Sequence, residues 1–183
     1  SVRSMVRIRM SRLGRKHRPF FRINAVEKRT QRDGKILEAL GWYDPMAKGG
    51  CTVIDVSLTG EVAQAWTGLN GTMMNCSGGP MPWGTWATCE ETVNGPDVGP
   101  DFTGASNIPL TQPHGYVFEV PTVGRATGEP ITRAGRFAHE SVAFDPRGGS
   151  LYLSEDNFAF PSGFYRYTPR TSPMETGRLD NEG

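Results

Sequence analysis

NCSGGPMPWGTWATCEET, residues 75–92 of the 183-residue sequence, holds the densest group of chemically unusual residues in the chain. Its first part, rich in glycine and proline, predicts a turn, and residues 85–88 predict a strand. The stretch ends on a thiol beside two carboxylates, Cys89, Glu90 and Glu91. The stretch therefore predicts a candidate metal site at the end of a strand.

Two adjacent carboxylates repel each other and are costly to bury, so they occur where water solvates both or where a cation neutralises them. A thiolate prefers transition metals, whereas carboxylates also suit hard cations such as Ca²⁺. One thiolate with several carboxylates therefore predicts a mixed metal site. A buried cysteine followed by a solvated glutamate pair explains the same residues, and both interpretations stand at this point.

The charge of the chain is divided between two parts. Residues 1–50 hold 13 Lys and Arg against 4 acidic residues, whereas residues 51–183 hold 7 against 15. This asymmetry predicts a polyanionic partner for the first part and cations for the second. The three cysteines do not form a disulfide pattern. No apolar run approaches the roughly 18 residues of a membrane span, and no apolar region follows the basic start, so we expect a cytoplasmic chain without a membrane partner.

The basic part predicts three strands, at residues 6–10, 20–26 and 36–43, with a basic loop at 11–19. Arginines on a sheet and its loops suit a phosphate backbone, although a solvated basic face is the simpler alternative. The sequence MVRIRMSRLGRKHRPFFRINAVEKRTQRDGKILEALGWYDP closely resembles the N-terminal half of bacterial small-subunit ribosomal protein sixteen. This resemblance covers residues 5–47 and implies contacts with small-subunit ribosomal RNA. The implied phosphate contacts are Arg12, Arg15, Lys16, His17, Arg18, Arg29, Arg32 and Lys35. In that family a helical half follows, but here nothing helical follows.

After residue 51 the pattern is that of short strands between glycine-rich turns, which favours a β-sandwich or a propeller. Strands are predicted at residues 52–56, 61–67, 116–120, 141–144, 151–154 and 164–167, and a polar tail from 171. Several apolar residues of these strands are predicted to form the core: Val117, Val120, Val142, Phe144, Leu151, Leu153 and Phe164. Two further strand ends carry acidic groups, Glu140 at one and Glu155 with Asp156 at the other. In a propeller such ends can meet in the central channel around cations.

The motifs GTMMNCSGGPMPWGTWATCEET, HGYVFEV, GRFAHESVAFDP and LYLSED resemble the PhoX-type alkaline phosphatases over about residues 52–169. The resemblance implies a six-bladed β-propeller that binds iron and calcium and hydrolyses phosphate monoesters. It implies Cys89 and Glu140 as iron ligands. It implies further metal-site carboxylates at Glu90, Glu91, Glu155 and Asp156. Arg136 or Arg166 could contact the substrate phosphate, although a structural arginine is the alternative.

The two resemblances divide the chain into residues 1–47, an RNA-binding segment without its helices; 48–51, a junction; 52–170, a propeller fragment; and 171–183, a disordered tail. The third of these holds two to three blades' worth of strands, too few to close a six-bladed ring. We therefore expect an inactive fragment of a metal-dependent phosphomonoesterase, which leaves its status as an enzyme undecided. The alternatives are a ribosomal RNA-binding protein and a nonfunctional chimeric reading frame. The phosphatase family is exported, in conflict with the cytoplasmic expectation.

Overall fold

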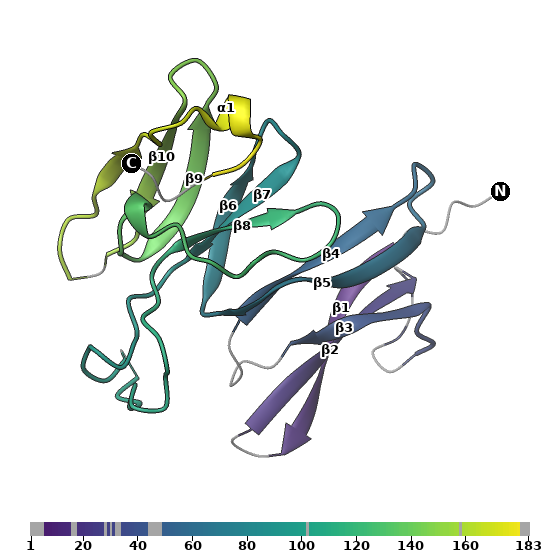
Figure 1. Ribbon diagram of the computed structural model, residues 1–183. Coiled ribbons are helices and arrows are strands. Elements are labelled where there is room, and N and C mark those ends of the chain that lie inside the picture. Colours follow the sequence, from purple (N-terminus) through teal and green to yellow (C-terminus); the bar gives the residue numbers. More distant parts are fainter. Residues whose placement is uncertain are drawn as a thin grey trace.

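The computed structural model describes residues 6–15, 18–27, 29, 31, 34–43, 49–101, 103–157 and 159–179. In chain order the elements are β1 (Val6–Arg15), β2 (Arg18–Glu27), β3 (Glu38–Tyr43), β4 (Gly49–Val56), β5 (Val62–Thr72), β6 (Asn75–Pro80), β7 (Thr85–Glu90), β8 (Val117–Pro121), a 3-10 turn (Thr132–Ala134), β9 (His139–Asp145), β10 (Ser150–Glu155), β11 (Phe164–Tyr167) and α1 (Pro173–Thr176). The strands form antiparallel sheets in the orders β1-β2-β3, β4-β5, β6-β7-β8 and β11-β10-β9 (Figure 1). The expectation of a mainly β protein is confirmed.

The basic N-terminal segment is the three-stranded sheet that the sequence predicts, but its first two strands are longer. β1 pairs with β2 without interruption from Val6 opposite Glu27 to Arg15 opposite Arg18. The predicted loop at 11–19 is therefore wrong, because the pairing extends through most of that basic stretch. Ile8 and Met10 on β1 are 60% and 61% exposed, so β1 presents apolar as well as basic side chains to solvent.

Residues 75–80, where the sequence predicted a turn, form the strand β6, and its glycines allow it to pack closely against β7 and β9. A Cβ on Gly78 would lie 2.0 Å from the Ala87 carbonyl oxygen, and one on Gly79 would lie 2.4 Å from that of Val142. Real Cβ atoms do not approach this closely, so glycine lets β6 lie against both β7 and β9. The turn itself comes later, where the Gly84 N–H donates to the Met81 carbonyl.

β8 takes part in two apolar clusters because its side chains alternate between the two faces of the sheet. Val117 belongs to the main core, which lies between the β6–β8 and β9–β11 sheets. Its neighbour Phe118 packs instead with Leu69 of β5 in a second cluster. Figure 1 shows the resulting order, with the β6–β8 sheet between the β9–β11 sheet and the β4–β5 hairpin.

Most of the predicted core residues are buried: Val117, Val120, Val142, Leu151 and Leu153. Phe144 is partly buried and packs edge-on against Trp83. Phe164 is 74% exposed, so its prediction as a core residue is wrong. It lies on β11, an edge strand, where its ring stacks on that of Tyr152.

The predicted tail contains structure. α1 begins at Pro173, and Leu179 after it is buried against the main core. Glu119 of β8 fixes this segment by accepting a hydrogen bond from the Leu179 N–H at 2.7 Å. No helix in the described ranges is both long and apolar enough to cross a bilayer.

Candidate metal centre

One thiol and two carboxylates converge near the end of β7. The possible ligand atoms of Cys76, Glu91 and Glu140 all lie within 4.8 Å of one another. Cys76 is on β6, Glu91 directly follows β7, and Glu140 is on β9. The Cys76 thiol donates to Glu140 Oε1 at 3.6 Å. We call these three residues the thiol–carboxylate cluster.

Two further predicted residues adjoin this cluster. Cys89 is fully buried, and its pKa is raised to about 12, first by burial and then by the charges of Cys76 and Glu140. Asp156 interacts with Glu91, whose pKa is raised by burial and by the neighbouring carboxylates of Glu140 and Asp156. Of the predicted site residues, the structure places Glu91 and Glu140 in the cluster and Asp156 beside Glu91. Cys89 packs in the main core next to the cluster, and its sulfur is not among the ligand atoms that lie within 4.8 Å of one another.

The arrangement fits a cation. Cys76 is exposed, but partial desolvation, followed by the hydrogen bonds and charges of Glu91 and Glu140, raises its pKa to about 11. Mutual repulsion of this kind is relieved when a cation occupies the centre of the acidic groups. The three residues could therefore hold a metal ion, with one sulfur and two carboxylate donors.

Glu90 faces away from the cluster, because successive side chains at the end of β7 point to opposite sides. It is fully buried, and its Oε1 lies 2.7 Å from His114 Nδ1. Its Oε2 accepts hydrogen bonds from the backbone N–H groups of Gly115 and Tyr116. The carboxylate is therefore engaged by protein donors.

Glu155 is also engaged elsewhere, by the loop that follows β10. It accepts hydrogen bonds from the Gly163 N–H and the Tyr165 hydroxyl, each at 2.9 Å, and from the Asn157 side chain at 3.2 Å. The Gly163 bond, followed by the Tyr165 bond, lowers its pKa. Glu155 thus closes a loop, whereas its neighbour Asp156 meets Glu91.

The two arginines predicted to contact phosphate differ in their surroundings. Arg136 forms an ion pair with Asp97 and donates to the carbonyls of His114 and Val93 at 2.8 and 3.0 Å. Arg166 is exposed on β11, opposite Tyr152 in the register of the sheet. Arg136 therefore holds the loop from 93 to 97 against the chain before β8.

Two groups in this region, Cys76 and His139, are not among the site residues predicted from the sequence. Cys76 was missed because β6 was interpreted as a turn; antiparallel pairing of 75–80 with 85–90 would have placed it near Cys89. His139, beside Glu140, is buried under the Phe137 ring and donates from Nε2 to the Gly135 carbonyl at 3.2 Å. Burial lowers its pKa to about 4.

The basic residues predicted to bind RNA lie on or beside the N-terminal sheet. Arg12, Arg29 and Lys35 are exposed. Arg15 and Arg18 are paired in the backbone register at the end of the β1–β2 pairing. Lys16, His17 and Arg32 lie outside the described residues.

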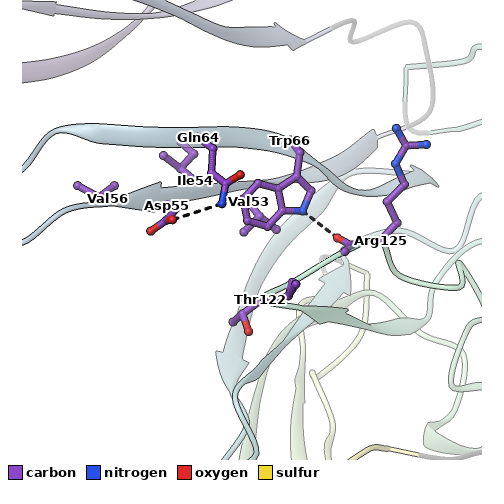
Figure 2. Close-up of a pocket in the computed structure, with 10 residues that line it drawn as sticks. Val53, Ile54, Asp55, Val56, Gln64, Trp66, Thr122 and Arg125 are labelled. Atoms are coloured by element: carbon purple, nitrogen blue, oxygen red, sulfur yellow. Dashed lines mark hydrogen bonds between the residues drawn. The ribbon is translucent and has the colours of Figure 1, made fainter.

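An open hollow of about 790 Å³ lies apart from the cluster, between the β4–β5 hairpin and the chain after β8. Figure 2 shows the Trp66 indole pointing across it, where Nε1 donates to the Gly124 carbonyl at 2.8 Å. Gln64 and Asp55 form a weaker contact at its edge, 3.4 Å apart. Its lining includes no residue of the cluster.

Curated relatives match only part of the chain. Small ribosomal subunit protein bS16 of Rhodopirellula baltica is 47% identical over 66 residues, which is 35% of this chain and 42% of that protein. The bS16 protein of a Polaromonas species is 56% identical over 46 residues, 25% of this chain and 55% of that protein. The bS16c protein of Mesostigma viride is 54% identical over 52 residues, 28% of this chain and 60% of that protein. The chain thus spans about half the length of the curated relatives it matches.

No solved structure matches the chain. A protein-family match, described as alkaline phosphatase PhoX, covers residues 25–183 and so begins within β2. It includes every residue of the thiol–carboxylate cluster, together with Cys89 and Asp156. Since this match extends over most of the sequence, the chain belongs to the PhoX alkaline phosphatase family.

Proposed function

We propose that the thiol–carboxylate cluster is part of the metal site of a phosphomonoesterase. The observation that carries the proposal is the convergence of Cys76, Glu91 and Glu140 from three segments, with ligand atoms within 4.8 Å of one another. Cys89 and Asp156 extend the same group. Iron at the thiol side and calcium at the carboxylate side are the ions that we propose, because these donors match their preferences.

A bound transition metal supplies Lewis-acid stabilisation of the charge on a phosphoryl group. The side chains of the site would bind that ion. Cys76 and Cys89 would provide sulfur, and Glu91 and Glu140 would provide oxygen. Asp156 would complete the acidic side. Glu90 and Glu155 are left out of this ligand set, because protein donors already engage them.

We expect metal binding with little turnover from this chain. Cationic side chains that hold the phosphate would add to the stabilisation that a metal supplies. Arg136 forms an ion pair with Asp97 and donates hydrogen bonds to backbone carbonyls, and Arg166 lies exposed on an edge strand. Neither side chain is shown at the cluster. The β6–β8 and β9–β11 sheets would correspond to two blades of an incomplete propeller, within the proposed unit of residues 52–170.

The experiment is metal loading of the full chain followed by desalting. We expect about one tightly held Fe²⁺ or Co²⁺ per chain, and p-nitrophenyl phosphate hydrolysis far below that of a whole family member. Cys89→Ser should release the metal. Cys51→Ser is the matched control, since Cys51 lies on β4 outside the cluster. Equal metal retention by both variants would contradict the proposal.

A second function is favoured by the N-terminal sheet: binding of structured RNA, as in a ribosomal protein or in a chimera that retains this segment. Its support is the exposure of four basic residues on or beside the N-terminal sheet, Arg7, Arg12, Arg29 and Lys35, together with the partial similarity to bS16 proteins. Phosphate contacts from such residues release counterions, so the affinity should fall steeply with salt.

Charge reversal tests this second function on small-subunit ribosomal RNA. Arg12→Glu and Lys35→Glu should each weaken binding and lower the salt slope by about 1. Arg147→Glu makes the same charge change in the exposed turn between β9 and β10 and serves as the control. An equal loss in all three variants would show a net-charge effect only.

A further inference from the structure

Glu90 occupies a central position behind the thiol–carboxylate cluster. Its Oε1 accepts a hydrogen bond from the Met73 N–H at 2.8 Å and contacts His114 Nδ1 at 2.7 Å. Its Oε2 accepts hydrogen bonds from the N–H groups of Gly115 and Tyr116 at 2.7 and 3.1 Å. Four donors match the acceptor capacity of one carboxylate, so neither oxygen is available to a metal.

These bonds join the segments that carry the cluster. Met73 immediately precedes the residues that lead into β6 and Cys76. The Glu91 N–H donates to the Met74 carbonyl at 3.0 Å, and the Glu90 N–H donates to the Tyr116 carbonyl at 3.0 Å. The start of β6, the end of β7 and the start of β8 are thus fixed to one another around a single buried side chain. The spacing between Cys76 and Glu91 depends on this junction.

His114 supports the junction from the other side. It is buried, and its Nδ1–H points to Glu90, while its Nε2 is buried without a hydrogen-bond partner in the described part of the chain. A histidine with one unsatisfied nitrogen costs stability, because a buried polar group loses its water. The same imidazole holds Glu90 in place through Nδ1, which is the role that we assign to His114.

We propose that Glu90 is the positioning residue of the cluster: its four hydrogen bonds set the distance between Cys76 and Glu91 that a cation requires, without a bond from Glu90 to that cation. The inference rests on the proposed metal site. Residues that orient metal ligands typically contribute 10–100-fold to metal affinity. The adjacent carboxylates of residues 90 and 91 therefore have different tasks, one structural and one ligating.

The test compares Glu90→Gln with Glu119→Gln in the full chain. Glu119 is the matched control, because it also accepts three hydrogen bonds, from Trp83, Thr85 and Leu179, but contacts no cluster residue. Co²⁺ affinity is measured by chelator competition, with the thiolate-to-cobalt absorption band as a spectroscopic readout. We expect Glu90→Gln to weaken Co²⁺ binding by about 10–100-fold and to alter the band. Glu119→Gln should stay within about twofold of the parent.

Hydrogen exchange supplies a second measurement that needs no variant. On Zn²⁺ binding to the parent chain, the amides of Met73, Gly115 and Tyr116 should keep their protection, since Glu90 stays bonded to them. Loss of that protection would identify Glu90 as a metal ligand and overturn the inference. If Glu90→Gln does not fold, this hydrogen-exchange measurement tests the role of Glu90 in its place. The milder variant His114→Asn is then used as well, and we expect it to lower the Co²⁺ affinity several-fold.

The possible failures are distinguishable. A parent chain that binds no Co²⁺ overturns the proposed metal site and this inference together. A parent chain that binds Co²⁺, with a folded Glu90→Gln variant that binds it equally well, overturns the inference alone.

Discussion

Cys76 Sγ lies 3.6 Å from Glu140 Oε1, although the two residues are 64 positions apart in the chain. The contact exists because β6, with glycine at positions 78 and 79, lies directly against β9. Close backbone packing is therefore what assembles the site.

Cys76→Ser should weaken Co²⁺ binding more than about 100-fold, because it removes a donor atom rather than a supporting residue. The measurement is Co²⁺ titration with chelator competition. Cys51→Ser should leave the affinity unchanged, since Cys51 packs in the second apolar cluster. An unchanged affinity of Cys76→Ser would exclude this thiol from the site.

Gly79→Ala should destabilise the protein by about 1–3 kcal/mol, the usual cost of overpacking, because the new methyl group would meet the Val142 carbonyl at 2.4 Å. Gly99→Ala is the control, with no atom within 4 Å of its Cβ. It should stay within about 0.5 kcal/mol in urea unfolding. Similar values for both variants would show that β6 and β9 are not closely packed.

Acidification should release the loop that begins at residue 93. The hydrogen bond from Arg136 holds the pKa of Asp97 below its usual value of 3.8. A lowered folded-state pKa stabilises the fold above 3.8, and this contribution is lost as the pH falls through the folded value. Hydrogen exchange or proteolysis of this loop between pH 5 and pH 2 measures the change. Asp97→Asn should remove the pH dependence, and an unaltered profile would contradict the assignment.

Leu179→Ala should cost about 2 kcal/mol, near the lower end for a buried leucine, because Leu179 is only 7% exposed against the main core. Met174→Ala, in α1 and 50% exposed, should have almost no effect on the free energy of unfolding. Equal effects in chemical denaturation would mean that the segment after α1 does not pack in solution.

Period-two alternation predicted most strands, because a strand buried on one face repeats every second residue. Residues 164–167 form β11 with the predicted limits, and five of the seven predicted core residues are buried. Phe164 shows the limit of this pattern. The alternation does not reveal that β11 is an edge strand, where an aromatic ring stays exposed.

The site was harder to predict than the strands. The glycines of β6 allow β7 and β9 to approach its backbone closely. The sequence alone does not distinguish glycines that allow close packing from glycines that form a turn. The strand that carries Cys76 was therefore not predicted, and Cys76 was missed. The acidic pairs Glu90–Glu91 and Glu155–Asp156 were each predicted to act together. Because successive side chains of a strand point to opposite faces, the two members of each pair lie in different surroundings. Glu90 and Glu155 accept hydrogen bonds from nearby backbone N–H groups, whereas Glu91 belongs to the cluster and Asp156 lies beside it.

X-ray absorption at the zinc edge of the Zn²⁺-loaded full chain identifies the ligand atoms of the proposed metal site. We expect sulfur ligands from Cys76 and Cys89 at about 2.3 Å from the zinc, together with oxygen ligands from the carboxylates at about 2.0–2.2 Å. A first shell of oxygen and nitrogen alone would contradict it.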